Sequence, residues 1–298
     1  MSLDFLERKC CPVCDFGNFK TFCKLPSYSL MRCQKCSLWL LNPYISKEGM
    51  KRIVSEPETI RKEYPMIYKY YESEVLRKEG SPTVITLSNE KKRILTFLKT
   101  VRPSGKLLEL GCGSGDFTRS AAEAGYEAFG LDFNPNSSPA SNDTFTFIHA
   151  DVEKTEFQPQ DVDVVCAFDV LEHCDDLKGL LTKIHKSLNA DGIVALTVPN
   201  AESLLHYLCL TAHKMTFSSF GRFLEGIFVI SHPIYFSLLA LSHLLESCHF
   251  KVIHHYQSST DLTKIKLNNL FRAAVEGVFM LSRLCSLQNR LVIFAGKN

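Results

Sequence analysis

The sequence lacks a long uninterrupted apolar run, an apolar leader and a large excess of either charge. Its longest apolar region, residues 223–241, contains Glu225, His232 and Pro233, so we expect it not to span a bilayer. Residues 1–9 contain no apolar segment of the length that a signal peptide requires. The formal net charge is only +2. We therefore expect a cytoplasmic protein without a transmembrane segment.

The small net charge hides an uneven distribution. Residues 1–105 carry 19 Lys and Arg against 11 Asp and Glu, whereas the remaining residues carry 15 against 21. Neither part contains a dense basic run of the kind that binds nucleic acid. The basic front is compatible with an anionic partner. A nucleic-acid acceptor is thus the less favoured interpretation, although the charge distribution does not exclude it.

Cysteine is abundant, with 12 in 298 residues. Six of them fall within residues 10–36, where two C-x2-C pairs are separated by 18 residues. This spacing is typical of a zinc site with four tetrahedral thiolates and not of a disulfide framework. Cys10 lacks the two-residue spacing to Cys14, and we expect Cys23 to be a free buried thiol. The predicted zinc ligands are Cys11, Cys14, Cys33 and Cys36.

A break at residues 103–105 (Pro-Ser-Gly) separates two patterns. Before it, residues 46–100 show an apolar side among many charges, including an aromatic cluster at residues 64–71, and this predicts helices. After it, strands alternate with helices. The expected strands are 106–110, 127–131, 146–149, 162–168, 193–198, 251–255 and 290–295, and the expected helices are 117–124, 177–188 and 235–248. This alternation predicts an α/β fold with a doubly wound, Rossmann-like, seven-stranded sheet.

A glycine-rich turn lies between the first predicted strand and the helix that follows it. Residues 107–117 read Leu-Leu-Glu-Leu-Gly-Cys-Gly-Ser-Gly-Asp-Phe, with three glycines in five positions. Glycine permits a tight turn and the close approach of a ligand to bare backbone. The segment resembles motif I of class I S-adenosylmethionine-dependent methyltransferases, in which an acidic residue, here Glu109, stands two places before the first glycine. A nicotinamide-binding turn would read G-x-G-x-x-G, so the spacing argues against a dehydrogenase.

Acidic residues follow the next two predicted strands. Asp132 lies 21 residues after Gly111, at a strand end where a carboxylate can accept hydrogen bonds from both hydroxyls of a ribose. Asp151 follows the third strand. The resemblance implies that Asp151 accepts a hydrogen bond from the adenine amino group and that Val152 contacts the ring.

Two later segments strengthen the resemblance. Residues 162–173, which end in Leu-Glu-His, and residues 188–200 resemble the next motifs of the same family, so the resemblance covers roughly residues 90–298. It implies that the chain binds S-adenosylmethionine. The residues expected at the cofactor are Glu109, Gly111, Cys112, Gly113, Gly115, Asp132, Phe133, Asp151, Val152 and Phe168.

The N-terminal cysteines fit this interpretation. Residues 38–43 resemble the exit of a zinc ribbon that precedes methyltransferase domains in some bacterial proteins, which implies a structural metal. We therefore expect a small N-terminal zinc ribbon at residues 1–45, a helical linker or cap at 46–100 and a methyltransferase domain at 101–298. Residues 201–230 are apolar and aromatic. They are expected to form either a lid over the acceptor or an ordinary helical insertion packed on the core.

Two histidines are candidate catalytic bases, because an oxygen acceptor must lose a proton during methyl transfer. His173 follows the fourth predicted strand, near the expected position of the methyl group. His232 follows the fifth strand, where related domains contact substrate. A structural role is the alternative for each: His173 packing at the start of its helix, and His232 as a hydrogen-bonding partner.

The sequence favours transfer of a methyl group from S-adenosylmethionine to a small-molecule acceptor, at oxygen or carbon, giving S-adenosylhomocysteine. An apolar lid would suit such an acceptor. One alternative is an RNA methyltransferase that uses the zinc module to hold its substrate. Another is a non-catalytic adaptor that has lost cofactor binding, against which the intact Glu109, Asp132 and Asp151 argue. The oligomeric state stays open.

Overall fold

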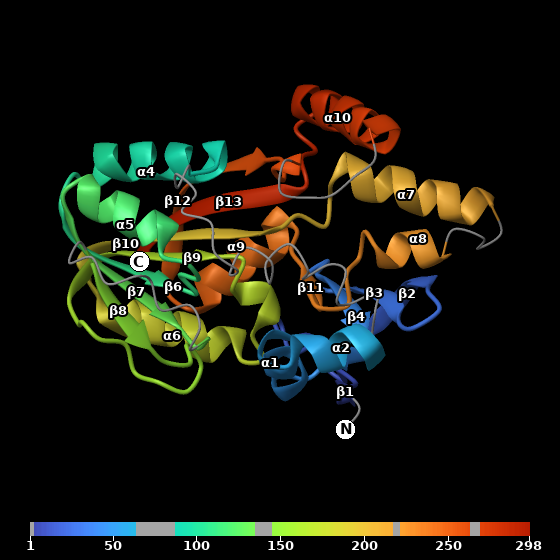
Figure 1. Ribbon diagram of the computed structural model, residues 1–298, viewed down its shortest axis with the longest axis horizontal. Coiled ribbons are helices and arrows are strands. Elements are labelled where there is room, and N and C mark those ends of the chain that lie inside the picture. Colours follow the sequence, from blue (N-terminus) through green and yellow to red (C-terminus); the bar gives the residue numbers. More distant parts are fainter. Residues whose placement is uncertain (1–2, 64–86, 135–144, 217–220, 263–268) are drawn as a thin grey trace. The chain divides into compact units, whose positions relative to one another are not determined.

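The computed structural model describes residues 3–63, 87–134, 145–216, 221–262 and 269–298 (Figure 1). The aromatic cluster at residues 64–71 lies outside these ranges. The chain forms two compact units, each assembled from three segments. The first, which we call the ribbon unit, contains residues 1–82, 199–241 and 257–291. The second, the sheet unit, contains residues 83–198, 242–256 and 292–298.

The sheet unit is built on the predicted seven-stranded sheet, with strand order β12-β13-β10-β9-β6-β7-β8. The strands are β6 (Gly105–Leu110), β7 (Tyr126–Asp132), β8 (Thr146–His149), β9 (Val162–Phe168), β10 (Leu188–Pro199), β12 (Phe250–Ser258) and β13 (Arg290–Lys297). Strands β6 to β10 pair in parallel. Strand β7, which follows β6 in the sequence, lies on one side of β6, and the later strands β9 and β10 lie on the other side of β6. The carboxyl end of β6 is therefore at the switch point where open α/β sheets bind ligands.

Helices cover both faces of this sheet. The helices among the described residues of this unit are α4 (Asn89–Val101), α5 (Asp116–Glu123) and α6 (Leu177–Ser187), and a 3-10 turn covers Leu171–His173. Ile94 of α4 and Phe117 of α5 share a buried cluster with Val164 of β9. The next residue, Val165, points to the other face and is also fully buried. Figure 1 shows α6 on the side of the sheet opposite α4 and α5. Burial on both faces explains the near-continuous apolar sequence of β9.

The ribbon unit contains a four-stranded sheet of order β11-β4-β3-β2 and a separate pair of strands, β1 and β5. These pairs are antiparallel. The strands are β1 (Phe5–Leu6), β2 (Phe19–Lys24), β3 (Ser29–Cys33), β4 (Trp39–Asn42), β5 (Tyr44–Ile45) and β11 (Ile234–Tyr235). Its described residues form the helices α1 (Lys47–Ser55), α2 (Pro57–Glu63), α7 (Leu204–Met215), α8 (Gly221–Glu225) and α10 (Asn269–Leu284). Helix α9 (Leu238–Ser247) spans the point in the sequence where this unit ends.

Residues 199–241 share a core with the N-terminal strands. Phe228 and Leu210 from this segment lie in one buried cluster with Trp39 of β4. The short strand β11 extends the ribbon sheet by pairing with β4. The hydroxyl of Tyr28 donates a hydrogen bond to the carbonyl of Phe228. The segment thus completes the core of a cysteine module that is too short to form a large one alone. Its role as a lid stays a prediction.

The sequence located the strands of the sheet well and some helix ends less well. The strands predicted at residues 146–149 and 162–168 are confirmed with the same bounds. The helix predicted to begin at residue 235 begins at Leu238, because residues 234–235 pair with β4 instead. The domain boundaries predicted at residues 45 and 100 stay predictions. Among the helices of the described residues, none has the length and apolar character needed to cross a membrane.

Candidate functional site

The glycine-rich turn begins where β6 ends. The N–H groups of Gly111 and Cys112 both donate to the carbonyl of Leu131 in β7, at 2.7 and 3.1 Å. The N–H of Gly115 donates to the carbonyl of Cys112 at 2.9 Å. The three glycines have positive φ angles of 67°, 55° and 74°. These left-handed conformations fold the turn back against β7 before α5 starts.

The three glycines differ in what surrounds them. A Cβ atom at Gly111 would lie 2.7 Å from the side chain of Val170, and one at Gly115 would lie 2.5 Å from the ring of Phe145. Packing within the protein therefore requires glycine at both positions. A Cβ at Gly113 would meet no described atom within 4 Å. The space in front of the Gly113 backbone is thus available to a ligand.

Asp132 ends β7 beside this space. Its carboxylate accepts a hydrogen bond from the N–H of Gly113 on one oxygen and from the N–H of Asn134 on the other, each at 2.8 Å. The side chain is only 8% exposed. Because an ionised carboxylate can accept about four hydrogen bonds, each oxygen retains capacity for one more donor. The geometry suits a ligand with two neighbouring hydroxyls.

The loop after β8 is tied to the loop after β7. The N–H of Ala150 donates to the carbonyl of Asp132 at 3.1 Å, and Nε2 of His149 lies 2.8 Å from the carbonyl of Phe133. The carboxylate of Asp151 accepts a hydrogen bond from the N–H of Glu153 at 3.0 Å. The two predicted cofactor carboxylates, Asp132 and Asp151, therefore lie on adjoining loops at the carboxyl ends of adjacent strands.

Glu109 is set into the interior of the sheet unit, with 1% of its surface exposed. Its carboxylate accepts hydrogen bonds from the hydroxyl of Thr118 and, at 3.4 Å, from Nζ of Lys91. Burial raises the pKa of Glu109, and the charge of Lys91 opposes that rise. Glu109 therefore links β6 to α4 and α5 and supports the turn. Its direct contact with a cofactor stays a prediction.

Lys91 is a residue that the sequence analysis missed. Its ammonium group forms an ion pair with Glu109 and lies 5.1 Å from the centroid of the Phe168 ring. The available signal was a cation in the first turn of a helix, where the helix dipole disfavours positive charge. A carboxylate compensates this charge, and here it comes from Glu109 of β6.

The other predicted cofactor residues differ in accessibility. Cys112 and Phe168 are 5% and 7% exposed, and the Phe168 ring contacts Phe117 edge-on with centroids 4.8 Å apart. Burial raises the pKa of the Cys112 thiol, which keeps it protonated. Phe133 is 41% exposed and Val152 is partly buried. Cys112 and Phe168 therefore contribute mainly to the core, whereas Phe133 is accessible to a ligand.

The two C-x2-C pairs of the ribbon unit fold into matching turns. In each, the N–H of the first cysteine donates to the carbonyl five residues later: Cys11 to Phe16 at 3.0 Å, and Cys33 to Leu38 at 2.8 Å. In each, the carbonyl of the first cysteine accepts from the N–H four residues later, at Asp15 and Ser37. Asp15 and Ser37 both have positive φ angles. Equal spacing in the sequence has thus produced equal backbone geometry.

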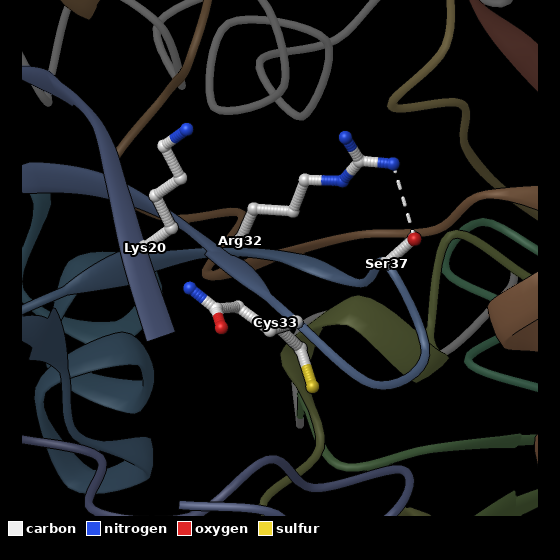
Figure 2. A pocket seen from close by; sticks show the side chains of 5 residues that line it. Lys20, Arg32, Cys33 and Ser37 are labelled. Atoms are coloured by element: carbon white, nitrogen blue, oxygen red, sulfur yellow. Dashed lines mark hydrogen bonds between the residues drawn. The ribbon is translucent and has the colours of Figure 1, made fainter. Parts of the chain in front are cut away.

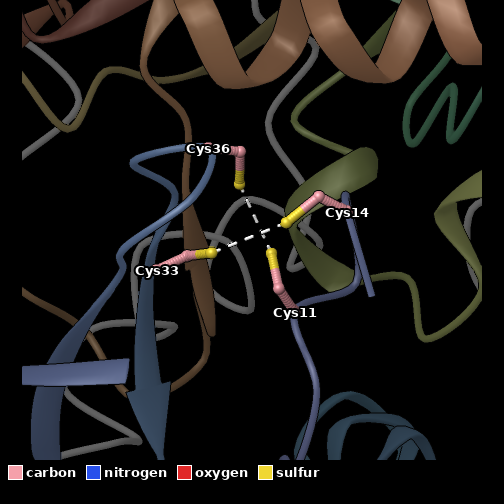
Figure 3. A group of neighbouring side chains, drawn as sticks. All are labelled: Cys11, Cys14, Cys33 and Cys36. Carbon is pink, nitrogen blue, oxygen red and sulfur yellow. Dashed lines mark hydrogen bonds between the residues drawn. The ribbon is translucent and has the colours of Figure 1, made fainter. Parts of the chain in front are cut away.

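The four cysteines of these turns converge on one point (Figure 3). Sγ of Cys11 lies 3.5 Å from Sγ of Cys36, and Sγ of Cys14 lies 3.6 Å from Sγ of Cys33. All four sulfurs lie within 4.8 Å of one another. Four thiolates around Zn²⁺ at about 2.3 Å would be separated by about 3.8 Å. The thiols therefore fit a single tetrahedral ion, while Cys10 is exposed and Cys23 is buried in the core.

Comparison with known proteins identifies the family. Residues 76–255, more than half of the chain, match the family described as "Methyltransferase domain". The chain belongs to the methyltransferase family. The matched residues include the glycine turn, Asp132 and Asp151. The family match confirms the methyltransferase family that the sequence motifs predicted, and the seven-stranded sheet confirms the predicted fold.

Individual relatives of this methyltransferase are distant. The mitochondrial ubiquinone biosynthesis O-methyltransferase of Schizosaccharomyces pombe is 27% identical over 116 residues, which are 36% of this chain and 42% of that protein. The chain therefore spans less than half the length of that curated relative.

Two solved structures share the fold. An S-adenosylmethionine-dependent methyltransferase from Archaeoglobus fulgidus has 20% identity and a TM-score of 0.50, covering 76% of this chain and all of that one. A Burkholderia thailandensis 1,6-didemethyltoxoflavin-N1-methyltransferase has 14% identity and a TM-score of 0.51, covering 92% and 96%. At these identities the likeness establishes the fold alone.

The two candidate bases of the methyltransferase belong to different units. His173 is the last residue of the 3-10 turn in the sheet unit, and its N–H donates to the carbonyl of Val170 at 3.0 Å. His232 precedes β11 in the ribbon unit, and its N–H donates to the carbonyl of Val229 at 2.8 Å. Both side chains are partly buried. Their catalytic roles stay predictions.

Proposed function

We propose that this methyltransferase transfers a methyl group from S-adenosylmethionine to a small-molecule acceptor, at oxygen or carbon, and releases S-adenosylhomocysteine. The observation that carries the proposal is the space in front of Gly113, which lies beside the Asp132 carboxylate. Backbone that approaches a ligand closely, next to a carboxylate with spare acceptor capacity, suits the amino-acid end and the ribose of this cofactor.

Different residues of the sheet unit would bind different parts of the cofactor. Gly113 offers open backbone to its amino-acid end, and Gly111, packed against Val170, brings the turn to that position. Asp132, held by the N–H groups of Gly113 and Asn134, accepts hydrogen bonds from the ribose hydroxyls. Asp151, on the adjoining loop, accepts one from the adenine amino group, with Val152 and Phe133 near the ring.

The cofactor, when bound, supplies a methyl group on a positively charged sulfur. The protein's part is to hold the attacking atom in line with that methyl group and to exclude water. An acceptor hydroxyl would also need a base to take its proton. We propose that this base is either His173, which follows β9, or His232, which precedes β11.

A small acceptor agrees with the activities named for the relatives. The Schizosaccharomyces pombe protein is named an O-methyltransferase of ubiquinone biosynthesis, and the Burkholderia thailandensis structure has 1,6-didemethyltoxoflavin bound. The compound bound in the second protein is a small organic molecule. The name of the first protein, an O-methyltransferase, favours oxygen as the attacking atom in this chain.

For the ribbon unit we propose one structural Zn²⁺, bound by the four converging cysteines. Four protein thiolates leave no open coordination position, so the ion would stabilise the fold and take no part in methyl transfer. The hydrogen bond between Cys11 and Cys36 lowers the pKa of the Cys11 thiol and raises that of Cys36.

A transfer assay with methyl-labelled S-adenosylmethionine tests the proposed function. The acceptors would be a panel of phenols and other small molecules, and total RNA would be tested in parallel. We expect label in extractable small molecules and none in precipitable RNA. Label confined to RNA would replace the small acceptor with a nucleic acid. If the protein binds the cofactor but transfers its methyl group to none of these acceptors, and not even to water during a long incubation, a non-catalytic adaptor would be favoured.

Substitution of the two histidines tests the chemistry. We expect His173→Ala or His232→Ala to lower turnover at least about a hundredfold, which is a typical contribution of a general base, while S-adenosylmethionine affinity changes little. Wild-type turnover in both variants would leave positioning as the whole mechanism.

A further inference from the structure

The ribbon unit contains a basic cavity that the proposed methyl transfer does not use. It has a volume of about 370 Å³ and is lined by Lys20, Arg32, Cys33, Gln34 and Ser37 (Figure 2). Small-molecule sites typically have volumes of about 300–1,000 Å³. The cavity therefore has room for an anionic group and for part of the molecule that carries it.

The hairpin of β2 and β3 places two cations side by side. Lys20 and Arg32 are direct partners in the antiparallel pairing, so their side chains project from the same face. Figure 2 shows both side chains extending to one side, while the sulfur of Cys33 points away from them. The guanidinium of Arg32 donates to the hydroxyl of Ser37 at 3.1 Å. This bond fixes the orientation of the guanidinium and leaves further N–H donors available.

Lys20 is exposed and Arg32 is partly buried, and the phenol of Tyr207 is the acidic group that Arg32 influences. No carboxylate in the described part of the chain lies within 4.0 Å of the charged group of Lys20 or of Arg32. By contrast, Lys91 and Arg52 each form an ion pair. Two adjacent positive charges repel each other, and an anion that binds between them would remove this repulsion.

We propose that Lys20, Arg32, Gln34 and Ser37 form a phosphate-binding site. A phosphate group carries up to two charges and several acceptor oxygens, which match two cations and two neutral donors. Arginine binds such a group through parallel hydrogen bonds, and lysine contributes a point charge. A phosphorylated small molecule and a polynucleotide both present this chemistry.

A competing role for the two cations is to balance the nearby thiolates. Four thiolates and one Zn²⁺ would carry a net charge of −2. Two observations favour the phosphate: the Cys33 sulfur points away from Lys20 and Arg32, and Ser37 has no charge with which to balance a thiolate. Zinc content and phosphate binding, measured in the same variants, separate the two roles.

The test is a calorimetric titration of pyrophosphate into zinc-loaded full-length protein. We expect Arg32→Gln to weaken binding about tenfold or more, because a charge-assisted hydrogen bond is lost, and Lys20→Gln and Ser37→Ala to weaken it several-fold. The matched control is Lys24→Gln, which removes an exposed cation from the same strand outside the cavity. This control should bind as the wild type does. All four variants should keep their zinc.

Several outcomes would overturn the proposal. The first is that the wild type does not bind pyrophosphate at millimolar concentration. The second is that Lys24→Gln weakens binding as much as Arg32→Gln does. The third is that Arg32→Gln loses its zinc while the wild type shows no phosphate binding, which would assign Arg32 to the metal site. A second titration with single-stranded RNA of increasing length identifies the source of the phosphate. Affinity that rises with length and falls steeply with salt indicates a polynucleotide, whereas affinity equal to that of pyrophosphate indicates a small molecule.

Discussion

The sheet unit and the ribbon unit hold their functional residues by different means. In the sheet unit, Asp132 and the glycine turn are fixed by backbone hydrogen bonds between adjacent parallel strands, over a core that is buried on both faces. In the ribbon unit, three of the four cysteines lie on turns and Cys33 ends β3, among strands of no more than six residues. The first site is thus formed by the fold itself. The second depends on the ion that its cysteines would bind.

The two units can be followed separately because the chain has a single tryptophan. Trp39 lies in the ribbon unit, in the buried cluster that also contains Phe228. Its fluorescence therefore reports the ribbon unit alone. Hydrogen exchange of the β6 and β9 amides reports the sheet unit.

The largest effect should come from removing the metal. Structural zinc contributes roughly 10–16 kcal/mol to the folding of small metal-dependent modules, so a strong chelator or Cys33→Ser should unfold the ribbon unit. Trp39 fluorescence should shift to the value of an exposed indole, while the β6 and β9 amides stay protected. Cys10→Ser, which changes an exposed neighbour of Cys11, is the control and should keep one zinc per chain. Full metal content in Cys33→Ser would refute the assignment of ligands.

A second effect is confined to the sheet unit. Lys91→Ala should destabilise it by about 2–3 kcal/mol, since Glu109 would remain buried without its cation, and the loss is moderated because Lys91 is itself 27% exposed. Exchange of the β6 amides should quicken accordingly. Lys92→Ala, the exposed neighbour on α4, should have no such effect. Addition of Glu109→Gln should restore much of the stability; failure to do so would show that the ion pair is not the cause.

A third effect makes the ribbon unit sensitive to acid. Burial lowers the pKa of His206 to about 4, so its ring is neutral in the folded state and binds a proton in the unfolded state below pH 6.5. Its stabilisation is complete above pH 6.5 and is lost as the pH falls from 6.5 to about 4. Between pH 7 and 5 the loss should be about 2 kcal/mol.

His206→Phe should remove this pH dependence from urea unfolding curves measured by Trp39 fluorescence. The quantity to compare is the slope of the unfolding free energy against pH. The absolute stability of the variant also changes, because it loses the contact of the ring with the Ala201 carbonyl. An unchanged slope would mean that another group governs the acid sensitivity. His255→Gln, an exposed position, should behave as the wild type does.

The smallest effect distinguishes ligand contact from backbone strain in the sheet unit. Gly113 and Gly125 both have positive φ, and a Cβ at either would meet no described atom within 4 Å. Gly113→Ala and Gly125→Ala should therefore lower the stability by the same amount, about 1 kcal/mol each. Only Gly113→Ala should also weaken S-adenosylmethionine binding, by about tenfold or more, because its Cβ would enter the ligand's space. Equal affinities in a calorimetric titration would remove Gly113 from the site.

The sequence predicted those features that depend on local signals. The run Val162–Phe168 and the turn around Gly113 are recognisable from neighbouring residues, and both are found where predicted. Pairing between strands that lie far apart in the sequence has no such local signal. Strand β11 has two residues, and only its partner in β4, about 195 positions earlier, makes it a strand.

The site residues show the same division. Asp132 follows a predictable strand end, whereas the partnership of Lys91 with Glu109 joins a helix to a strand through side chains alone. Lys20 and Arg32 become neighbours only through the register of their hairpin, which also contains an irregularity between Thr21 and Cys23. Composition and spacing carry no information on that register.

The central claim, that the glycine turn and Asp132 bind S-adenosylmethionine, is tested most directly by calorimetric titration of this cofactor and its demethylated product into wild type and Asp132→Ala. The carboxylate should contribute two charge-assisted hydrogen bonds, each of about 1.5–3 kcal/mol, so its removal should weaken binding by about a hundredfold or more. Asp151→Ala should cost less, because apolar contacts and water can replace part of its contribution. Wild-type protein that binds neither ligand at millimolar concentration, or an Asp132→Ala variant that binds as tightly as the wild type, would contradict the account.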